Sequence, residues 1–255
     1  MSEVKVLTKA FDVLEAIVEY RERSCSDLSR DLSMPMSTVH RIVQNLEEKG
    51  YVSRTGQGRY KLGPRFLFLK TGVVEEYDAA EIARPFMEKM VEETRESSNL
   101  GVLEGKRVIH ICRVESPEAL RANIPTMTLS VHTSATGKLL LAFKPEEEII
   151  AFFPESIPAE TPQSITDRSA FLEQLRLTRE RHYSIDDQEG FEDVVGMAVP
   201  VVNQNEEIFA ALSLVGPVSR FNLKSYPEHA ATLFHYAGII SRRLGCGRYP
   251  FGGHS

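Results

Sequence analysis

A short segment near the N-terminus, residues 37–45, carries polar side chains suited to reading the edges of DNA bases. Glutamine and asparagine can form paired hydrogen bonds with adenine, arginine can do so with guanine, and serine or threonine can reach bases or phosphates. Apolar residues recur in the same stretch at i, i+3, i+4 and i+7, which is the spacing of the buried face of a helix. The apolar positions are Val39, Ile42, Val43 and Leu46. The other face holds the candidate base-reading residues Ser37, Thr38, His40, Arg41, Gln44 and Asn45.

The residues around this face limit its extent. Glu47 and Glu48 follow it directly, and phosphate would repel them, so we expect the base-reading part to end at Asn45. Basic residues further along would add phosphate contacts, which position a protein on DNA without specifying a sequence. These are Arg54, Arg59 and Lys61, and Ser26 upstream completes the candidate DNA-contacting set. For any single residue, an ordinary solvated surface is the alternative.

Residues 133–138, TSATGK, contain residue types found in phosphate-binding loops and in sites with a serine nucleophile, but their spacing fits neither kind of site. A phosphate loop needs the pattern G-x-x-x-x-G-K-[ST], which this segment lacks. Ser134 and Lys138 do not have the S-x-x-K spacing of a serine nucleophile with its lysine, and no K-T-G element follows. The sequence contains no visible set of nucleophile, base and orienting group, so we do not predict an enzyme.

Three acids, Asp186, Asp187 and Glu189, lie close together and could run acid–base chemistry or hold a metal. We expect them to be solvated, which is the more common fate of clustered acids at a strand–loop junction. The histidines show neither H-x-x-x-H nor H-E-x-x-H spacing, so we expect them to be satisfied inside the fold or exposed. They include His110, His132, His182, His229 and His235. We therefore predict no metal and no cofactor.

The elements that would position the base-reading face form an ordered series. Amphipathic spacing predicts three helices, and a change to a period of two around a glycine-containing turn predicts a β-hairpin. The predicted helices span about 6–20, 25–32 and 35–49, with Gly50 as the last terminator, and the hairpin strands span 51–54 and 59–62. This is the order of a winged helix-turn-helix, in which the second helix of the turn motif enters the major groove. A winged helix can also mediate protein contacts.

The remaining chain predicts an α+β body. An apolar linker helix over 64–77 leads into a helix over 78–96, which Pro85 should bend or restart. Further strands and helices follow, and Ser134 or Thr136 would begin one of the helices. Predicted strands cover 99–103, 108–114, 120–124, 127–131, 194–202 and 208–215, and predicted helices cover 133–143, 145–153, 167–183 and 225–244. We expect residues 247–255 to form a disordered tail.

Charge is distributed unevenly along the 255 residues, whose net charge is −6. Residues 1–72 hold 12 Lys/Arg against 9 Asp/Glu, a balance of +3, and the remainder holds 18 against 27, a balance of −9. A basic N-terminal domain on an acidic body indicates different partners, with a polyanion suited to the first. Three scattered cysteines, no signal pattern and no long apolar run predict a cytoplasmic protein with reduced thiols and no membrane association.

Longer stretches of the sequence resemble the IclR family of bacterial transcriptional regulators. The most specific are MPMSTVHRIVQNLEEKGYV and GRYKLGPR, and the second half agrees in IARPFMEKMVEET, VHTSATGKLLLAF, TRERHYSIDDQE and AALSLVGPVSRF. The resemblance implies a winged helix-turn-helix domain over 1–63, a linker helix over 64–77 and a GAF-like effector domain over 78–246. The effector domain would be an antiparallel sheet with flanking helices. The resemblance also implies a repressor or activator that binds a palindromic operator in double-stranded DNA as a homodimer or homotetramer.

In the family, small organic, sugar or aromatic acids bind the second domain, and the resemblance implies such a site here. The matching positions are Ser134, Ala135, Thr136, Gly137, Asp186, Val194, Gly196, Ser213 and Val215. Because a helix N-terminus suits a carboxylate, residues 134–137 could bind the acid group. Asp193, Gly196 and Val215 depart from the usual family residues, and an extra acid would oppose an anion unless it is turned away or protonated. A small-molecule-binding module or enzyme with an accessory helix-turn-helix is the alternative function.

Overall fold

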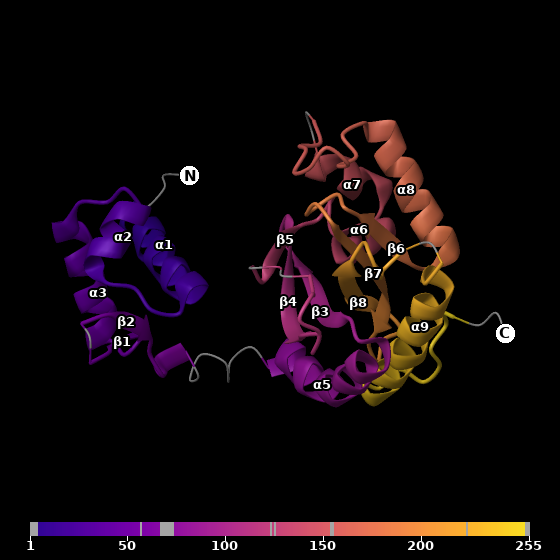
Figure 1. Ribbon diagram of the computed structural model, residues 1–255, viewed down its shortest axis with the longest axis horizontal. Coiled ribbons are helices and arrows are strands. Elements are labelled where there is room, and N and C mark those ends of the chain that lie inside the picture. Colours follow the sequence, from indigo (N-terminus) through magenta and orange to yellow (C-terminus); the bar gives the residue numbers. More distant parts are fainter. Residues whose placement is uncertain are drawn as a thin grey trace. The chain divides into compact units, whose positions relative to one another are not determined.

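The computed structural model describes residues 5–252, except 57, 67–73, 123, 125, 154, 155 and 223, and it describes only the backbone of 74–78. The chain divides into two compact units, Met1–Glu75 and Glu76–Ser255 (Figure 1). The middle of the predicted linker helix, residues 67–73, lies outside the described residues. The predicted fold class is confirmed, because a helix-turn-helix unit is followed by an α+β unit.

The first unit is a winged helix-turn-helix built around a small apolar core. Its elements are α1 (Lys5–Tyr20), α2 (Cys25–Asp31), α3 (Met36–Glu48), β1 (Val52–Arg54) and β2 (Tyr60–Leu62). Three apolar positions of the predicted stripe, Val39, Ile42 and Val43, are buried in this core together with Leu28 of α2. Burial of the stripe fixes the rotation of α3 about its axis, so the opposite polar face is turned to solvent.

Local capping and backbone geometry determine where these elements begin and end. The Asp27 amide donates to the Ser24 Oγ at 3.1 Å and the Ser24 amide donates to the Asp27 carboxylate at 3.2 Å, forming a capping box before α2. Gly50 follows α3 with a φ of +77°, as expected of a glycine terminator. Paired backbone hydrogen bonds between Arg23 and Tyr60, at 2.9 and 2.7 Å, tie the hairpin to the turn before α2.

The second unit is an antiparallel sheet with helices on both faces (Figure 1). Six described strands pair in the order β5-β4-β3-β8-β7-β6. Their bounds are β3 (Ser97–Glu104), β4 (Arg107–Val114), β5 (Thr128–Ser130), β6 (Ser184–Asp187), β7 (Val194–Val202) and β8 (Ile208–Pro217). The described helices are α5 (Val74–Thr94), α6 (Ala135–Ala142), α7 (Glu146–Phe152), α8 (Arg168–Arg181) and α9 (Tyr226–Arg243).

Alternation along each strand divides the core between the two faces of the sheet. Met197 of β7 belongs to the core formed with α5 and α9. The next residue, Ala198, packs instead with Ala135 at the start of α6. Because side chains of a strand alternate between faces, every second residue of β7 and β8 points to the α6 side. This α6-facing side carries the second candidate site.

The structure differs from one part of the expectation for Pro85 and from the expectation for residues 120–124. The helix does not restart at Pro85, since α5 continues through it with Pro85 exposed while Ala83 and Met87 lie in the core. A bend of α5 at Pro85 stays a prediction. No strand forms among the described residues of 120–124. That segment is a loop that buries Ala122 and Ile124, so its apolar residues indicate packing and not strand pairing.

The expected disordered tail is wrong for residues 247–252, the part of it that the structure describes. The Tyr249 hydroxyl donates to the backbone oxygen of Pro200 at 2.7 Å. The Phe251 ring lies 5.0 Å from the His182 ring and 5.9 Å from the Phe143 ring, measured between centroids. Two aromatic anchors therefore hold this segment against the second unit, although its glycine content favours a mobile chain.

Candidate functional site

The base-reading face of α3 is open to solvent in the first unit. Ser37, His40, Arg41, Gln44 and Asn45 are exposed and Thr38 is half-buried. The Asn45 Nδ2 donates to the backbone oxygen of Arg41 at 2.7 Å, so part of its amide is already engaged by its own helix. The structure brings the six predicted side chains together on the side of α3 that is turned away from the core, with the exposure that contacts to base edges require.

The predicted phosphate-contacting residues lie on the hairpin beside α2. Arg54, Arg59 and Lys61 are exposed, as is Ser26 in the first turn of α2. The Arg59 guanidinium lies 3.6 Å from the Asp27 carboxylate. Hydrogen bonds from Ser24 hold the pKa of Asp27 below its usual range, so this carboxylate stays charged and partly compensates Arg59. Sequence patterning did not reveal this ion pair, because it joins residues far apart along the chain.

Five of the predicted effector residues lie on the adjacent strands β6, β7 and β8, and the other four lie at the start of α6. Strand pairing places Asp186 beside Gly196 and Gly196 beside Val215. A Cβ placed on Gly196 would lie 3.5 Å from the Ala135 Cβ and 3.7 Å from the Asp186 Cβ. The structure therefore brings α6, β6, β7 and β8 together at this position. Val194 packs nearby with the 120–124 loop residues Ala122 and Ile124.

The start of α6 is held by close contacts within the protein. The Gly137 amide donates to the Ser134 Oγ at 3.1 Å, and that hydroxyl donates to the backbone oxygen of Ser130 at 2.8 Å. Ser134 is thus the N-cap, one of the two residues, Ser134 and Thr136, at which the sequence predicts the helix to begin. A Cβ on Gly137 would lie 2.3 Å from the Val131 oxygen, so the close approach of α6 to residue 131 requires glycine. Ala135 and Thr136 are both buried.

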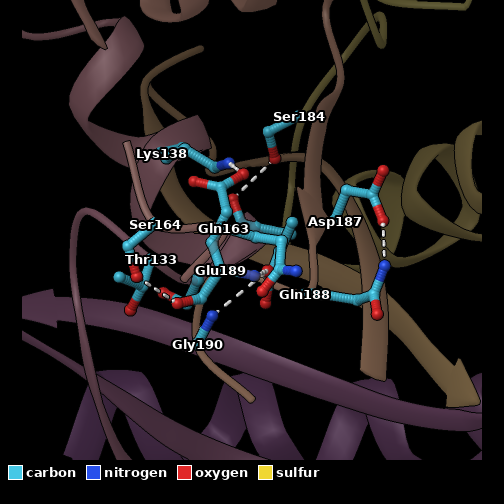
Figure 2. A network of polar contacts seen from close by, with 12 residues as sticks. Thr133, Lys138, Gln163, Ser164, Ser184, Asp187, Gln188, Glu189 and Gly190 are labelled. Carbon is cyan, nitrogen blue, oxygen red and sulfur yellow. Dashed lines mark hydrogen bonds and ion pairs between the residues drawn. The ribbon is translucent and has the colours of Figure 1, made fainter. Parts of the chain in front are cut away.

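Two of the three clustered acids are buried, so the expectation that all are solvated is wrong for Asp186 and Glu189. Lys138 of α6 is 2% exposed and forms an ion pair with Glu189, which is 5% exposed (Figure 2). The Asp186 Oδ1 accepts hydrogen bonds from the Glu189 amide at 2.8 Å and the Gly190 amide at 3.4 Å. Asp187 is exposed, as expected.

Burial raises the pKa of both acids, and the positive charge of Lys138 opposes both shifts. Desolvation raises the pKa of Asp186 to about 7, although Lys138 opposes this shift. Desolvation also raises the pKa of Glu189, again against the effect of Lys138. Sequence spacing could not reveal this arrangement, because Lys138 and Glu189 are 51 residues apart.

Three polar residues of this face, Asn99, His110 and Arg113, were not predicted as site residues. Pairing between β4, β3 and β8 sets Arg113 beside Asn99 and Asn99 beside Ser213. His110 lies opposite Gly101 in the neighbouring row. A Cβ on Gly101 would lie 2.8 Å from the Thr136 Cγ2 and 3.0 Å from the His110 Cδ2, so the imidazole reaches the start of α6. His110 and Arg113 could have been found as polar residues within the mostly apolar strand β4, whereas Asn99 follows two serines in β3 and carries no such signal.

Asp193, which could have opposed an anionic ligand, is turned to solvent. It is exposed and has a φ of +61° in the turn before β7. Water therefore screens its charge from the α6-facing side. A cavity of about 930 Å³ lies elsewhere, between α9 and the C-terminal segment, with Phe234 and Tyr249 in its lining. None of the predicted effector residues lines that cavity.

No described helix is long and apolar enough to span a bilayer.

Two family models match the sequence. The model described as bacterial transcriptional regulator IclR C-terminal matches residues 71–242, and the model of the IclR helix-turn-helix domain matches residues 6–56. The HTH-type transcriptional regulator KdgR of Dickeya chrysanthemi is 30% identical over 251 residues, 97% of this chain and 82% of that protein. KdgR of Escherichia coli (strain K12) is 30% identical over 251 residues, 97% of this chain and 95% of that protein.

The structure of an IclR homolog from Microbacterium hydrocarbonoxydans, complexed with 4-hydroxybenzoate, superimposes with a TM-score of 0.80 at 28% identity. The match covers 94% of this chain and 98% of that chain. Because the two family models cover both units and the relatives align along nearly the whole chain, the protein belongs to the IclR family of bacterial transcriptional regulators, with a DNA-binding helix-turn-helix domain and an effector-binding C-terminal domain.

Proposed function

We propose that this regulator reads its operator through the exposed polar face of α3. The observation that carries the proposal is the division of α3 into a buried apolar stripe and a solvent-facing row of hydrogen-bonding side chains. Arg41 and Gln44 would contact base edges, while Arg54 and Lys61 of the hairpin would contact phosphates. Arg59 would contribute less, because Asp27 shares its charge.

The proposed effector is a small organic acid bound on the α6-facing side of the sheet. The buried start of α6 offers a helix N-terminus to a carboxylate, beside Asp186, Gly196 and Ser213. Because burial raises the pKa of Asp186 to about 7, a fraction of this acid is protonated near neutral pH and repels an anion less. The 4-hydroxybenzoate bound to the Microbacterium homolog supports an acid of this size.

The proposed assembly on DNA is a homodimer or homotetramer. Several exposed side chains of α1 are apolar, with Leu7 55% exposed and Phe11 59% exposed. Exposed apolar patches of this kind mark interaction sites, and a second copy is the partner that a palindromic operator supplies by symmetry. Sedimentation of the full chain with and without operator DNA measures this state.

The test of the DNA assignment uses a duplex selected from a random library by the wild-type protein. Gln44→Ala should weaken binding to that duplex by about 1–3 kcal/mol while leaving binding to random duplex unchanged. Lys61→Ala is the matched control. It should weaken binding to both duplexes alike and reduce the slope of log affinity against log salt concentration by about one. Fluorescence anisotropy over a range of salt concentrations separates the two outcomes.

A triple variant, Arg41/Gln44/Asn45→Ala, examines the recognition helix as a whole. All three side chains are exposed, so circular dichroism should show an unchanged fold. Affinity for the selected duplex equal to that of the wild type would falsify the assignment of α3 as the reading helix. Candidate acids can then be added to the wild-type complex, where an effector shifts DNA affinity and is recovered chemically unchanged.

A further inference from the structure

The α6-facing side of the sheet holds buried polar atoms that the fold itself leaves without partners. His110 is 3% exposed, and neither of its ring nitrogens has a hydrogen-bond partner among the described residues. Asn99 is 2% exposed, and its Oδ1 has no such partner within the described part of the chain either. A buried polar atom without a hydrogen-bond partner lowers the stability of the folded protein. Two neighbouring side chains with such atoms therefore need an explanation other than stability, and binding of a ligand is one.

These atoms point to the same side of the sheet as the proposed effector site. His110 lies across Gly101 from Thr136, which belongs to the first turn of α6. Asn99 pairs with Ser213 on β8, and the Ser213 hydroxyl donates to the Asn99 backbone oxygen at 3.2 Å. The unpartnered groups therefore flank the α6 start from the β3–β4 side, opposite Asp186 and Gly196 on β6 and β7.

The hydrogen-bonding capacity of this cluster selects the chemistry of its partner. The Asn99 Oδ1 only accepts, and a neutral imidazole offers one donor and one acceptor. Burial, aided by the nearby Arg113 charge, lowers the pKa of His110 to about 4, so the ring is neutral at physiological pH. The Arg113 Nε is a further donor without a partner among the described residues. A hydroxyl group can both donate and accept, whereas a carboxylate would face the Asn99 oxygen unfavourably.

We propose that His110 and Asn99 are specificity-determining residues that bind a hydroxyl group of the effector, whose carboxylate lies at the start of α6. The ligand class is therefore a hydroxylated carboxylic acid, a sugar acid or a hydroxyaromatic acid. This inference rests on the proposed function, since it takes the α6-facing side as the effector site. A site built to hydrogen-bond a hydroxyl discriminates strongly against the analogue that lacks it, because its own polar groups are then left unpaired.

The test compares matched acids with and without hydroxyl groups on the full-length protein. The probes are 4-hydroxybenzoate against benzoate and gluconate against hexanoate, with affinities measured by isothermal titration calorimetry. The wild type should bind the hydroxylated member of at least one pair about tenfold or more tightly. His110→Phe and Asn99→Leu should each reduce that preference to about twofold or less. His229→Phe is the matched control, because His229 lies on α9 against the opposite face of the sheet, and it should keep the wild-type preference.

Equal wild-type affinity for both members of each pair overturns the inference while leaving an acid-binding regulator in place. A preference that survives in both His110→Phe and Asn99→Leu overturns it as well. If none of the four acids binds the wild type, the inference and the proposed acid effector both fail, and binding to the selected duplex still tests the DNA-binding function. In His110→Gln, which retains a donor and an acceptor, partial recovery of the preference supports hydroxyl recognition.

Discussion

Replacing Lys138 by methionine removes a buried positive charge while keeping most of the side-chain volume. Lys138 and Glu189 are both almost completely buried, and one oxygen of Glu189 has no hydrogen-bond partner among the described residues. The substitution therefore leaves an uncompensated carboxylate inside the second unit. Breaking a buried ion pair by removing one partner costs about 3–5 kcal/mol, and we expect Lys138→Met to destabilise this unit by that amount at neutral pH.

A second substitution should recover most of this loss. Glu189→Gln removes the charge that Lys138→Met leaves behind, and the double variant should lie within about 1–2 kcal/mol of the wild type. The matched control is Lys144→Met, which makes the same change in the ion pair with Glu148, where the side chains are 44% and 54% exposed. An exposed pair of this kind contributes less than about 1 kcal/mol.

Urea unfolding followed by far-UV circular dichroism measures these free energies, since the chain has no tryptophan to report by fluorescence. The two units can unfold separately, so each variant is compared within the transition of the second unit. A Lys138→Met protein as stable as Lys144→Met would refute the reasoning. A double variant as unstable as Lys138→Met alone would show that lost packing, and not the unpaired charge, causes the effect.

Burial raises the pKa of Asp186 from 3.8 to about 7, so the folded protein binds this proton more tightly than the unfolded chain does. Protonation of Asp186 therefore stabilises the fold fully below about pH 4, and this contribution is lost as the pH rises through 7. Asp186→Asn should therefore flatten the dependence of Tm on pH between pH 5 and 8 and raise Tm at pH 8. Gly137→Ala, with its Cβ 2.3 Å from the Val131 oxygen, should cost at least about 2 kcal/mol, whereas Gly247→Ala, which has open space, should be neutral in the same unfolding assay. Tyr249→Phe removes the hydrogen bond to Pro200 and should lower the free energy of unfolding by about 0.5–1.5 kcal/mol. An unchanged free energy of unfolding would show that residues 247–252 do not pack stably against the second unit.

Local signals predicted the first unit well. The spacing of Val39, Ile42 and Val43 determines which face of α3 is buried, and Gly50 supplies the positive φ that ends the helix. The start of α6 is likewise predicted to within two residues, with Ser134 and Thr136 as the candidates and Ser134 as the observed N-cap. These features depend on residues only a few positions apart, so periodicity and backbone preference are sufficient to predict them.

The second site depended on contacts between distant parts of the chain. Lys138 contacts Glu189 because the loop after β6 comes to lie against α6. In the sequence the acids look like a solvated cluster, whereas in the structure Glu189 belongs to a buried ion pair. The row of Arg113, Asn99 and Ser213 exists only after three strands pair in register. The loop at 120–124 and the segment at 247–252 were misjudged for the same reason, since their packing partners lie far away in the sequence. The sequence by itself determined the helix-turn-helix, its exposed polar face and the order of the domains, because short-range periodicity encodes them. Only the tertiary structure decided which polar groups lie buried and unpaired beside α6, because burial depends on which strands and loops come to cover them.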